Sequence, residues 1–342
     1  MQTTQIVTAS SESTLYLSHQ ILSKVMEYRR YPKDSSICKE AACQSCASVH
    51  LPKIIESIRE GKPIVFVLPA FPGKSPNTEK VLGRLPDHAE ALSLVFLDNL
   101  CNEIEDLYAP GAQIILCSDG RVFSDAVGIR ESDVSAYQKE LTNIIGELGL
   151  SNLATFNLDD FYHDMSFNQM REELMKSYGQ SLDFLKNKIS RGSLDCAEPN
   201  EVEALRMYCG ITRFLFEDSL LPGQTKSRSN LQKEARIKAY EVIRRSNAWS
   251  ELIEEHFPEA VRLSIHPQTC GSKKLGIRLI ADESWMTPWH GVALQTDNGF
   301  QLIRKDEAEK LGAHLVFTQS GKPSHYQLLG RKIANLEQLN AI

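Results

Sequence analysis

Two mostly apolar segments, the first of them uninterrupted, constrain the fold of this chain more than any other feature of its sequence. Residues 63–71 read PIVFVLPAF, and residues 112–119 read AQIILCSD. Such runs are typical of strands buried on both faces of a parallel sheet, because a half-exposed strand alternates apolar and polar residues. Both runs are far shorter than the ~20 residues that cross a bilayer. The sequence therefore predicts a buried sheet and no membrane span.

Helical patterns and turn signals surround these strands in the order of an α/β fold. Ser75 and Pro76 have the residue types of an N-cap and a first helical position, which predicts a helix soon after the first strand. The other predicted helices lie at 14–31, 52–60, 87–108 and 132–148, and a third strand lies at 153–158. We therefore predict a Rossmann-like α/β fold with a mostly parallel sheet and flanking helices.

The pattern changes along the chain and divides it into four segments. They are an N-terminal helical segment (1–60), a Rossmann-like core (61–165), a helical insertion (166–257) and C-terminal strands that complete the core (258–342). Within the insertion we predict three long helices, at 166–190, 199–219 and 230–255. After it, four short apolar runs (VRLSI, GIRLI, GVALQ and GFQLI) predict strands, the last two as a hairpin added to the same sheet.

The overall charge and the N-terminal sequence limit the classes of partner. A formal net charge of −6 is the opposite of what a nucleic-acid binder needs. The first residues contain no basic segment ahead of an apolar one, so we expect no secretory signal and a cytoplasmic protein. Eight cysteines in 342 residues are too dilute for a disulfide framework. We expect small-molecule substrates, with neither a nucleic acid nor a membrane as partner.

The loop after the first predicted strand carries cations that can bind an anion. In an open parallel sheet, ligands bind beyond the carboxyl ends of the strands. A phosphate there can be held by Lys74, by free N–H groups of a helix that starts near Ser75, and by Lys80 and Arg84. The loop is not a Walker A loop, because Leu68 stands where that motif needs glycine. The alternative is that these cations are ordinary solvated side chains.

Two further groups of polar residues follow predicted strands. The loop SDGRVFSD contains Ser118, Asp119, Arg121 and Asp125; its arginine can bind a phosphate or a carboxylate, and its acids can accept a proton. The alternative is a turn with a structural ion pair. Near the C-terminus, His266 ends a predicted strand, Lys274 follows it, and Trp289 and His290 precede another strand. Imidazole suits proton transfer near neutral pH, although many histidines are purely structural.

A cysteine-rich segment is a possible metal site. Cys38, Cys43, Cys46 and His50 offer three thiolates and an imidazole. Steps of three and four residues also place side chains on one face of a helix, so a purely structural interpretation stays open. We assign no metal to the chain on this pattern alone.

At these loops the chain resembles the pyoverdine/dityrosine biosynthesis family, the isocyanide (isonitrile) synthases. The resemblance rests on YRRY at 28–31, the segment 63–90 around LPAFPGKSPN, the segment 108–129 around SDGRVFSD, RLSIHPQ at 262–268 and TPWHG at 287–291. It implies an enzyme that converts the amino group of tryptophan or tyrosine to an isonitrile, with ribulose 5-phosphate as carbon donor. It also implies neither a metal nor a redox cofactor, and a product that passes to an iron(II)/2-oxoglutarate oxygenase.

The implied reaction gives each candidate residue a role. For proton transfer the candidates are His266, His290, Asp119, Asp125 and Lys80. For binding the substrates they are Lys74, Ser75, Arg84, Ser118, Arg121 and Lys274, with Phe71 and Trp289 as walls for an aromatic side chain. Two other classes compete with a synthase. One is a sugar-phosphate aldolase with a Schiff base on Lys74 or Lys80. The other is a non-catalytic, metal-binding regulatory protein built on the cysteine-rich segment.

Overall fold

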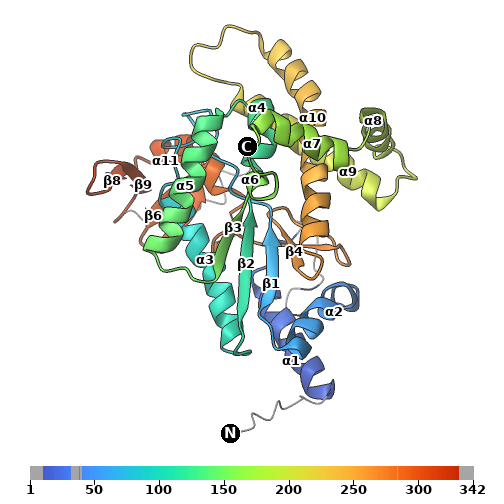
Figure 1. Cartoon of the computed structure of the whole chain (residues 1–342). Coiled ribbons are helices and arrows are strands. Elements are labelled where there is room, and N and C mark those ends of the chain that lie inside the picture. The colour runs from blue at the N-terminus through green and yellow to red at the C-terminus, as the bar shows by residue number, and fades with distance from the viewer. Residues whose placement is uncertain (1–10, 32–37, 39–40, 283, 331–342) are drawn as a thin grey trace.

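The computed structural model describes residues 11–31, 38, 41–282 and 284–330, and the statements below refer to these residues. The predicted absence of a secretory signal rests on residues 1–10, which lie outside them. Among the described helices, none combines the length and the apolar character needed to cross a membrane. The fold is a mixed α/β architecture with two separate sheets, as Figure 1 shows. The predicted fold class is confirmed.

The central sheet has five strands, all parallel. Its strands are β1 (Ile64–Leu68), β2 (Ala112–Cys117), β3 (Leu153–Phe156), β4 (Val261–Ser264) and β5 (Lys274–Gly276). Their order in the sheet is β3-β2-β1-β4-β5. The chain therefore builds outward from β1 to β3 and then returns to the other side of β1. All three strands predicted in the first half of the chain are confirmed.

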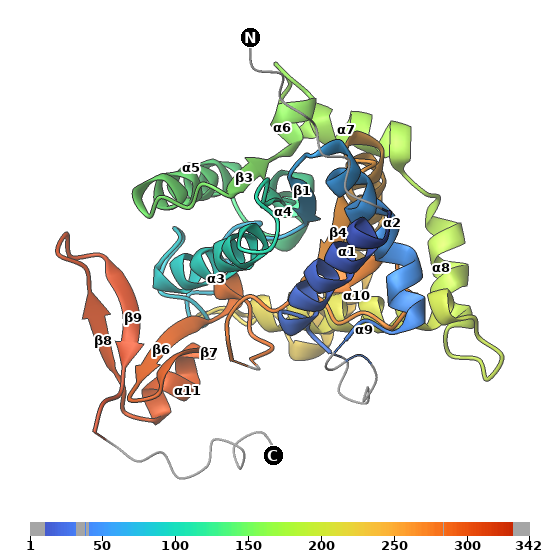
Figure 2. The same ribbon diagram turned by 90° about the horizontal axis from the view of Figure 1, so that it is seen from below.

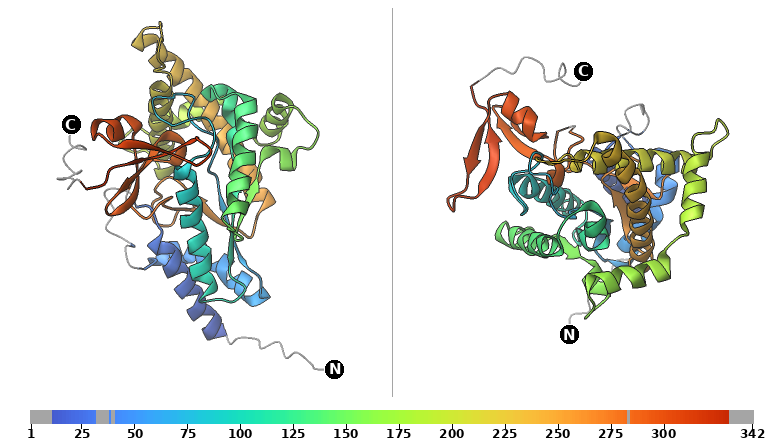
Figure 3. Two further views of the ribbon diagram at one scale, coloured as in Figure 1. Left: turned by 90° about the vertical axis from the view of Figure 1, so that its left-hand side faces the viewer. Right: turned by 90° about the horizontal axis from the view of Figure 1, so that it is seen from above.

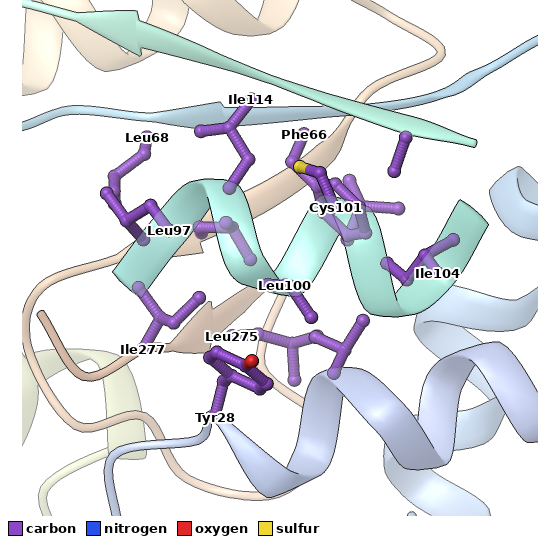
Figure 4. Close-up of a cluster of buried hydrophobic side chains, with 14 of the residues drawn as sticks. Tyr28, Phe66, Leu68, Leu97, Leu100, Cys101, Ile104, Ile114, Leu275 and Ile277 are labelled. Carbon is purple, nitrogen blue, oxygen red and sulfur yellow. The ribbon is translucent and has the colours of Figure 1, made fainter. Parts of the chain in front are cut away.

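The apolar run of β1 packs on both faces of the sheet, which explains why it does not alternate. Phe66 and Leu68 belong to the larger core with α1 (Ser11–Glu27), α2 (Gln44–Glu60) and α3 (His88–Glu105). Figure 4 shows Phe66, Leu68 and Ile114 above Leu97 of α3. Val67 joins a second cluster with Trp249 on the opposite face. Successive side chains of a strand point to opposite faces, so a helix layer on each side demands apolar residues at every position.

Helix α3 begins where its capping residues predict, but two other predictions differ from the structure. Helix α2 begins at Gln44, eight residues before the predicted start at 52. The Asp87 side chain accepts a hydrogen bond from the N–H of Ala89, and Glu90 completes the capping box at the start of α3. No helix begins at Ser75, so that prediction is wrong. The backbone N–H of Ser75 instead donates to the carbonyl of Trp289, 2.9 Å away. A long-range contact therefore replaces the local helix.

The segment predicted as a helical insertion contains four helices where three were expected. They are α7 (Phe167–Tyr178), α8 (Leu182–Arg191), α9 (Pro199–Asp218) and α10 (Arg228–His256). The predicted helix 166–190 is divided into two. Helix α7 ends before Gly179, and the Ser181 side chain caps the start of α8. Helix α10 runs along the sheet while α8 and α9 extend to its side (Figure 3). Helices α4 (Gly120–Val127) and α5 (Glu131–Glu147) connect β2 to β3, and the short helix α6 (Leu158–Phe161) follows β3.

The C-terminal strands do not all join the central sheet. The hairpin of β6 (Val292–Thr296) and β7 (Gly299–Ile303) forms a second sheet with β8 (His314–Phe317) and β9 (Pro323–Gln327), in the order β7-β6-β9-β8. The prediction that the hairpin extends the central sheet is wrong. The short helices η1 (Pro288–His290) and α11 (Lys305–Lys310) flank β6 and β7. This second sheet lies beside α3, as Figure 2 shows from below.

Candidate active site

The strand order places a topological switch point between β1 and β4, where proteins of this architecture bind ligands beyond the carboxyl ends of the strands. The crossover reverses direction between these two strands, so the loops that follow them separate there. The strand arrows in Figure 1 point upward to this edge, where α4 and the helical segment lie. Polar side chains from the loops after β1, β2 and β4 meet this edge. They form three groups.

The first group surrounds Asp218 at the end of α9. Its Oδ1 accepts hydrogen bonds from the Ser75 hydroxyl at 2.9 Å and from the Lys80 ammonium at 2.6 Å. Its Oδ2 lies 3.7 Å from Nε2 of His290. Asp218 is 4% exposed. Burial lowers the pKa of His290 to about 4 despite the nearby Asp218 carboxylate, so the imidazole is neutral at pH 7. The group combines a cation, a carboxylate and a neutral imidazole.

Sequence reasoning missed Asp218 because nothing in FLFEDSLLPG distinguishes it from an ordinary helix end. The aromatic residue Phe214, one turn earlier on α9, packs against His290 with ring centroids 4.9 Å apart. It is half-buried, whereas the predicted aromatic walls Phe71 and Trp289 are fully buried against each other. The helical segment therefore supplies both an acid and an aromatic surface to the site.

The second group is a single carboxyl, Asp119. It follows β2 directly and occupies the N-cap position of α4, but its side chain makes no capping bond. Its Oδ1 is buried without a hydrogen-bond partner in the described structure. Burial raises the pKa of Asp119 to about 7. A carboxyl group with a pKa near neutrality can both accept and return a proton at physiological pH.

The third group consists of His266, which follows β4, and Lys274, at the start of β5. Burial, followed by the charges of Arg30 and Lys274, lowers the pKa of His266 to about 4, although the residue is exposed to solvent. Burial also lowers the pKa of Lys274, and no ion pair forms on its ammonium within the described structure. This cation is available to an anionic ligand.

Lys74 is not available in this way. Its ammonium has three N–H donors, and three acceptors lie within 3.0 Å: carboxylate oxygens of Asp87 and Glu90, both at 2.8 Å, and the carbonyl of Pro288. Burial opposes the charge, but the two carboxylates raise the pKa of Lys74 above its usual value. The geometry argues against the prediction that Lys74 binds a substrate anion. The residue instead ties the β1 loop to α3 and η1.

Ser118 also holds this loop. Its hydroxyl donates to the carbonyl of Phe71 at 2.9 Å, and Gln138 donates to the same carbonyl at 2.8 Å. Phe71 has φ of 58°, a conformation that side chains rarely adopt, and the two donors stabilise it. A Cβ on Gly120 would lie 1.9 Å from the carbonyl oxygen of Pro72. The two loops after β1 and β2 therefore touch backbone to backbone.

The remaining predicted residues have structural partners outside these groups. Arg121 donates to Asp159 at 2.7 Å and lies over the ring of Phe167. Asp125 pairs with Arg245 at 2.7 Å. Arginines 245 and 171 outweigh its partial burial and lower the pKa of Asp125, which makes it a poor proton carrier. Arg84 pairs with Asp133 on the surface. The structural interpretation of these three residues fits the geometry better than the functional one.

A parallel sheet with polar groups at its switch point places the chain among Rossmann-like α/β proteins. The model of the pyoverdine/dityrosine biosynthesis protein family matches residues 54–316. An L-tryptophan isonitrile synthase of Fischerella ambigua is 42% identical, and the alignment covers 94% of each chain. An L-tyrosine isonitrile synthase of Xenorhabdus nematophila is 44% identical over 91% of each chain. The crystal structure of PvcA from Pseudomonas aeruginosa is 43% identical, has a TM-score of 0.83, and covers 91% of this chain and 99% of its own. This chain belongs to the pyoverdine/dityrosine biosynthesis family.

Proposed function

We propose that this protein is an isonitrile synthase that acts on an aromatic L-amino acid, tryptophan or tyrosine, with ribulose 5-phosphate as the carbon donor. One observation carries the proposal. Four relatives that are named as L-tryptophan or L-tyrosine isonitrile synthases are 41–44% identical to it over more than nine-tenths of both chains. Identity to the tryptophan enzymes and to the tyrosine enzymes is nearly equal, so both amino acids enter the proposal.

The three polar groups supply what this reaction needs. The amino group must lose a proton before its nitrogen attacks the keto carbon, and the carbonyl oxygen must gain protons before it leaves as water. Asp119 is the proton carrier because the pKa of its carboxyl lies near neutrality. The His290–Asp218–Lys80 group is the second acid–base unit, because a neutral imidazole and an ammonium both lie next to the same carboxylate.

Both substrates carry anionic groups that need a cation. We assign Lys274 to this task because its ammonium has no ion pair in the described structure and lies close enough to His266 to lower the pKa of that imidazole. Phe214, beside His290, is the candidate surface for the aromatic ring of the amino acid. The product would then pass to an iron(II)/2-oxoglutarate oxygenase.

The aldolase alternative has little support in the site. A Schiff-base lysine reacts as the neutral amine, which requires a lowered pKa. The pKa of Lys74 is raised, and Lys80 is in contact with the Asp218 carboxylate at 2.6 Å. Borohydride treatment with ribulose 5-phosphate is therefore expected to leave no sugar on the protein.

The direct test is mass spectrometry of the purified protein with ribulose 5-phosphate labelled at the keto carbon, and with either L-tryptophan or L-tyrosine. Relative to the amino acid, the expected product has gained one labelled carbon and lost two hydrogens. A product without the label would overturn the choice of carbon donor. Covalent trapping of the sugar, with no change in either amino acid, would replace the synthase with the aldolase.

A further inference from the structure

Four cysteines from distant parts of the chain converge behind the β4–β5 loop. Cys43 occupies the N-cap of α2, Cys46 lies in its first turn, Cys38 precedes the helix, and Cys270 lies between β4 and β5. All four Sγ atoms lie within 4.8 Å of one another, and none is in a disulfide. We call them the four-cysteine cluster.

The spacing of the sulfurs fits a tetrahedral ion. Zinc binds thiolates at about 2.3 Å, so the sulfurs at the corners of its tetrahedron lie about 3.8 Å apart. Two of the distances in the cluster are 3.5 Å (Cys38 to Cys270) and 4.0 Å (Cys38 to Cys46), one on each side of that value. A disulfide would join only one pair of sulfurs and leaves the convergence of the other two unexplained. Four thiolates with no oxygen ligand favour zinc over the harder cations.

The surroundings of the cluster suit negatively charged sulfur. The backbone N–H of Cys43 donates to Sγ of Cys38 at 3.0 Å. N–H groups of Cys46 and Gly271 reach the sulfurs of Cys43 and Cys46. The Arg29 guanidinium lies 3.6 Å from Sγ of Cys46 and 3.9 Å from Sγ of Cys270. Four thiolates and one zinc ion carry a net charge of −2, which these donors and the arginine partly offset.

The ligand set differs from the one considered on the sequence. His50 completes the sequence pattern, but its ring nitrogens are not in the group of converging atoms. Cys270, which is 232 residues beyond Cys38, takes the fourth position. No spacing rule could have selected it, because only the return of the chain to β4 brings it there.

We propose that the four-cysteine cluster binds one structural zinc ion. Four protein ligands leave no open coordination position, so the ion supports the fold and takes no part in chemistry. It fastens the β4–β5 loop to α2 behind the segment that presents His266. Arg29 and Arg30 brace the same segment by donating to the carbonyls of Gln268 at 3.1 Å and Ile265 at 2.7 Å. The proposal is independent of the substrate of the enzyme.

Metal analysis of the full-length protein, purified under reducing conditions and freed of loose metal by gel filtration, tests the proposal. We expect about one zinc per chain. Cys270→Ser should lose the zinc, while Cys196→Ser should keep it, because Cys196 is exposed and outside the cluster. His50→Ala should also keep it, which separates the observed ligand set from the sequence pattern.

A second measurement covers the case in which Cys270→Ser fails to fold. Chelation of the wild-type protein should lower its melting temperature, and cobalt added to the reduced, metal-free protein should give the intense visible absorption of a tetrahedral thiolate site. Reduced protein that takes up neither zinc nor cobalt would overturn the proposal. So would one equivalent of iron in place of zinc, or an intact Cys38–Cys270 disulfide in the active protein.

Discussion

Two lysines near the carboxyl edge of the central sheet differ in the groups that surround their ammonium nitrogens. Lys74, in the loop after β1, has two carboxylates and a carbonyl within 3.0 Å of its ammonium nitrogen, and the two carboxylates raise its pKa. Lys274, at the start of β5, has no ion pair in the described structure, and burial lowers its pKa. The sequence presents both as candidate anchors. Their surroundings make the first a structural residue and leave the second available to a ligand.

The buried carboxyl groups repeat this contrast. Burial raises the pKa of both Glu90 and Asp119 to about 7. Glu90 accepts hydrogen bonds from Tyr137 and from the N–H of Asp87, and it pairs with Lys74. Asp119 has a buried oxygen with no partner. A shifted pKa by itself therefore does not identify a catalytic group; the unpartnered oxygen is what distinguishes Asp119.

The largest effect is expected for Asp119→Asn. Removal of a proton carrier lowers the rate by roughly 10²- to 10⁴-fold. Turnover of amino acid and ribulose 5-phosphate measures it, with Asp125→Asn, in the helix that Asp119 precedes, as the matched control. We expect the control to keep most of the activity because Asp125 is already paired with arginine. Equal losses in the two variants would remove Asp119 from the catalytic role.

Lys74→Met should affect folding more than binding. It leaves the carboxylates of Asp87 and Glu90 buried without their cation, and breaking a buried pair in this way costs about 3–5 kcal/mol of unfolding free energy. Urea unfolding followed by fluorescence measures the loss. Lys274→Met is the control and should change stability far less. A stable Lys74→Met protein that fails only to bind the sugar phosphate would reverse the assignment of the two lysines.

Lys274→Met should instead weaken substrate binding. A hydrogen bond to a charged group contributes about 1.5–3 kcal/mol, so KM for one anionic substrate should rise by roughly ten-fold to a hundred-fold. Steady-state kinetics with each substrate varied separately will show which anion the lysine binds. Unchanged KM values for both substrates would leave Lys274 without a role in binding.

The pH dependence of stability should distinguish the Asp119 carboxyl from paired ones. Its folded-state pKa is raised to about 7 from an ordinary value near 3.8. The folded protein therefore binds more protons than the unfolded chain between these values, and the group destabilises the fold as pH rises through this window. Asp119→Asn removes that cost, so the variant should gain stability over the wild type from pH 4 to pH 8. Melting curves across this range test the sign; a constant difference would contradict the shift.

The smallest effect is expected for Arg84→Ala. Its ion pair with Asp133 lies on the surface, where such pairs contribute about 0–1 kcal/mol. Unfolding free energy and both KM values should change little. A large rise in KM would restore Arg84 as an anion anchor, as the sequence had predicted, and would mean that the surface pair opens when substrate binds.

The sequence by itself determined the layers of the fold. Alternate residues of β1 contact different helices, and this need for apolar side chains at every position is visible in PIVFVLPAF. Asp87 began α3 as its capping pattern predicts, because a cap depends on residues three positions apart. Local interactions of this kind depend on residues that are close in the sequence, so the sequence alone predicts the first three strands.

The tertiary structure alone decided which polar residues share a site. Asp218 meets Ser75 and Lys80, 143 and 138 residues away, and Cys270 meets Cys38 across 232 residues. It also decided that the β6–β7 hairpin forms a separate sheet with β8 and β9. A charge is functional or structural according to the partners that surround it, and those partners arrive only when the chain folds back on itself. Residue type and spacing along the chain do not contain that information.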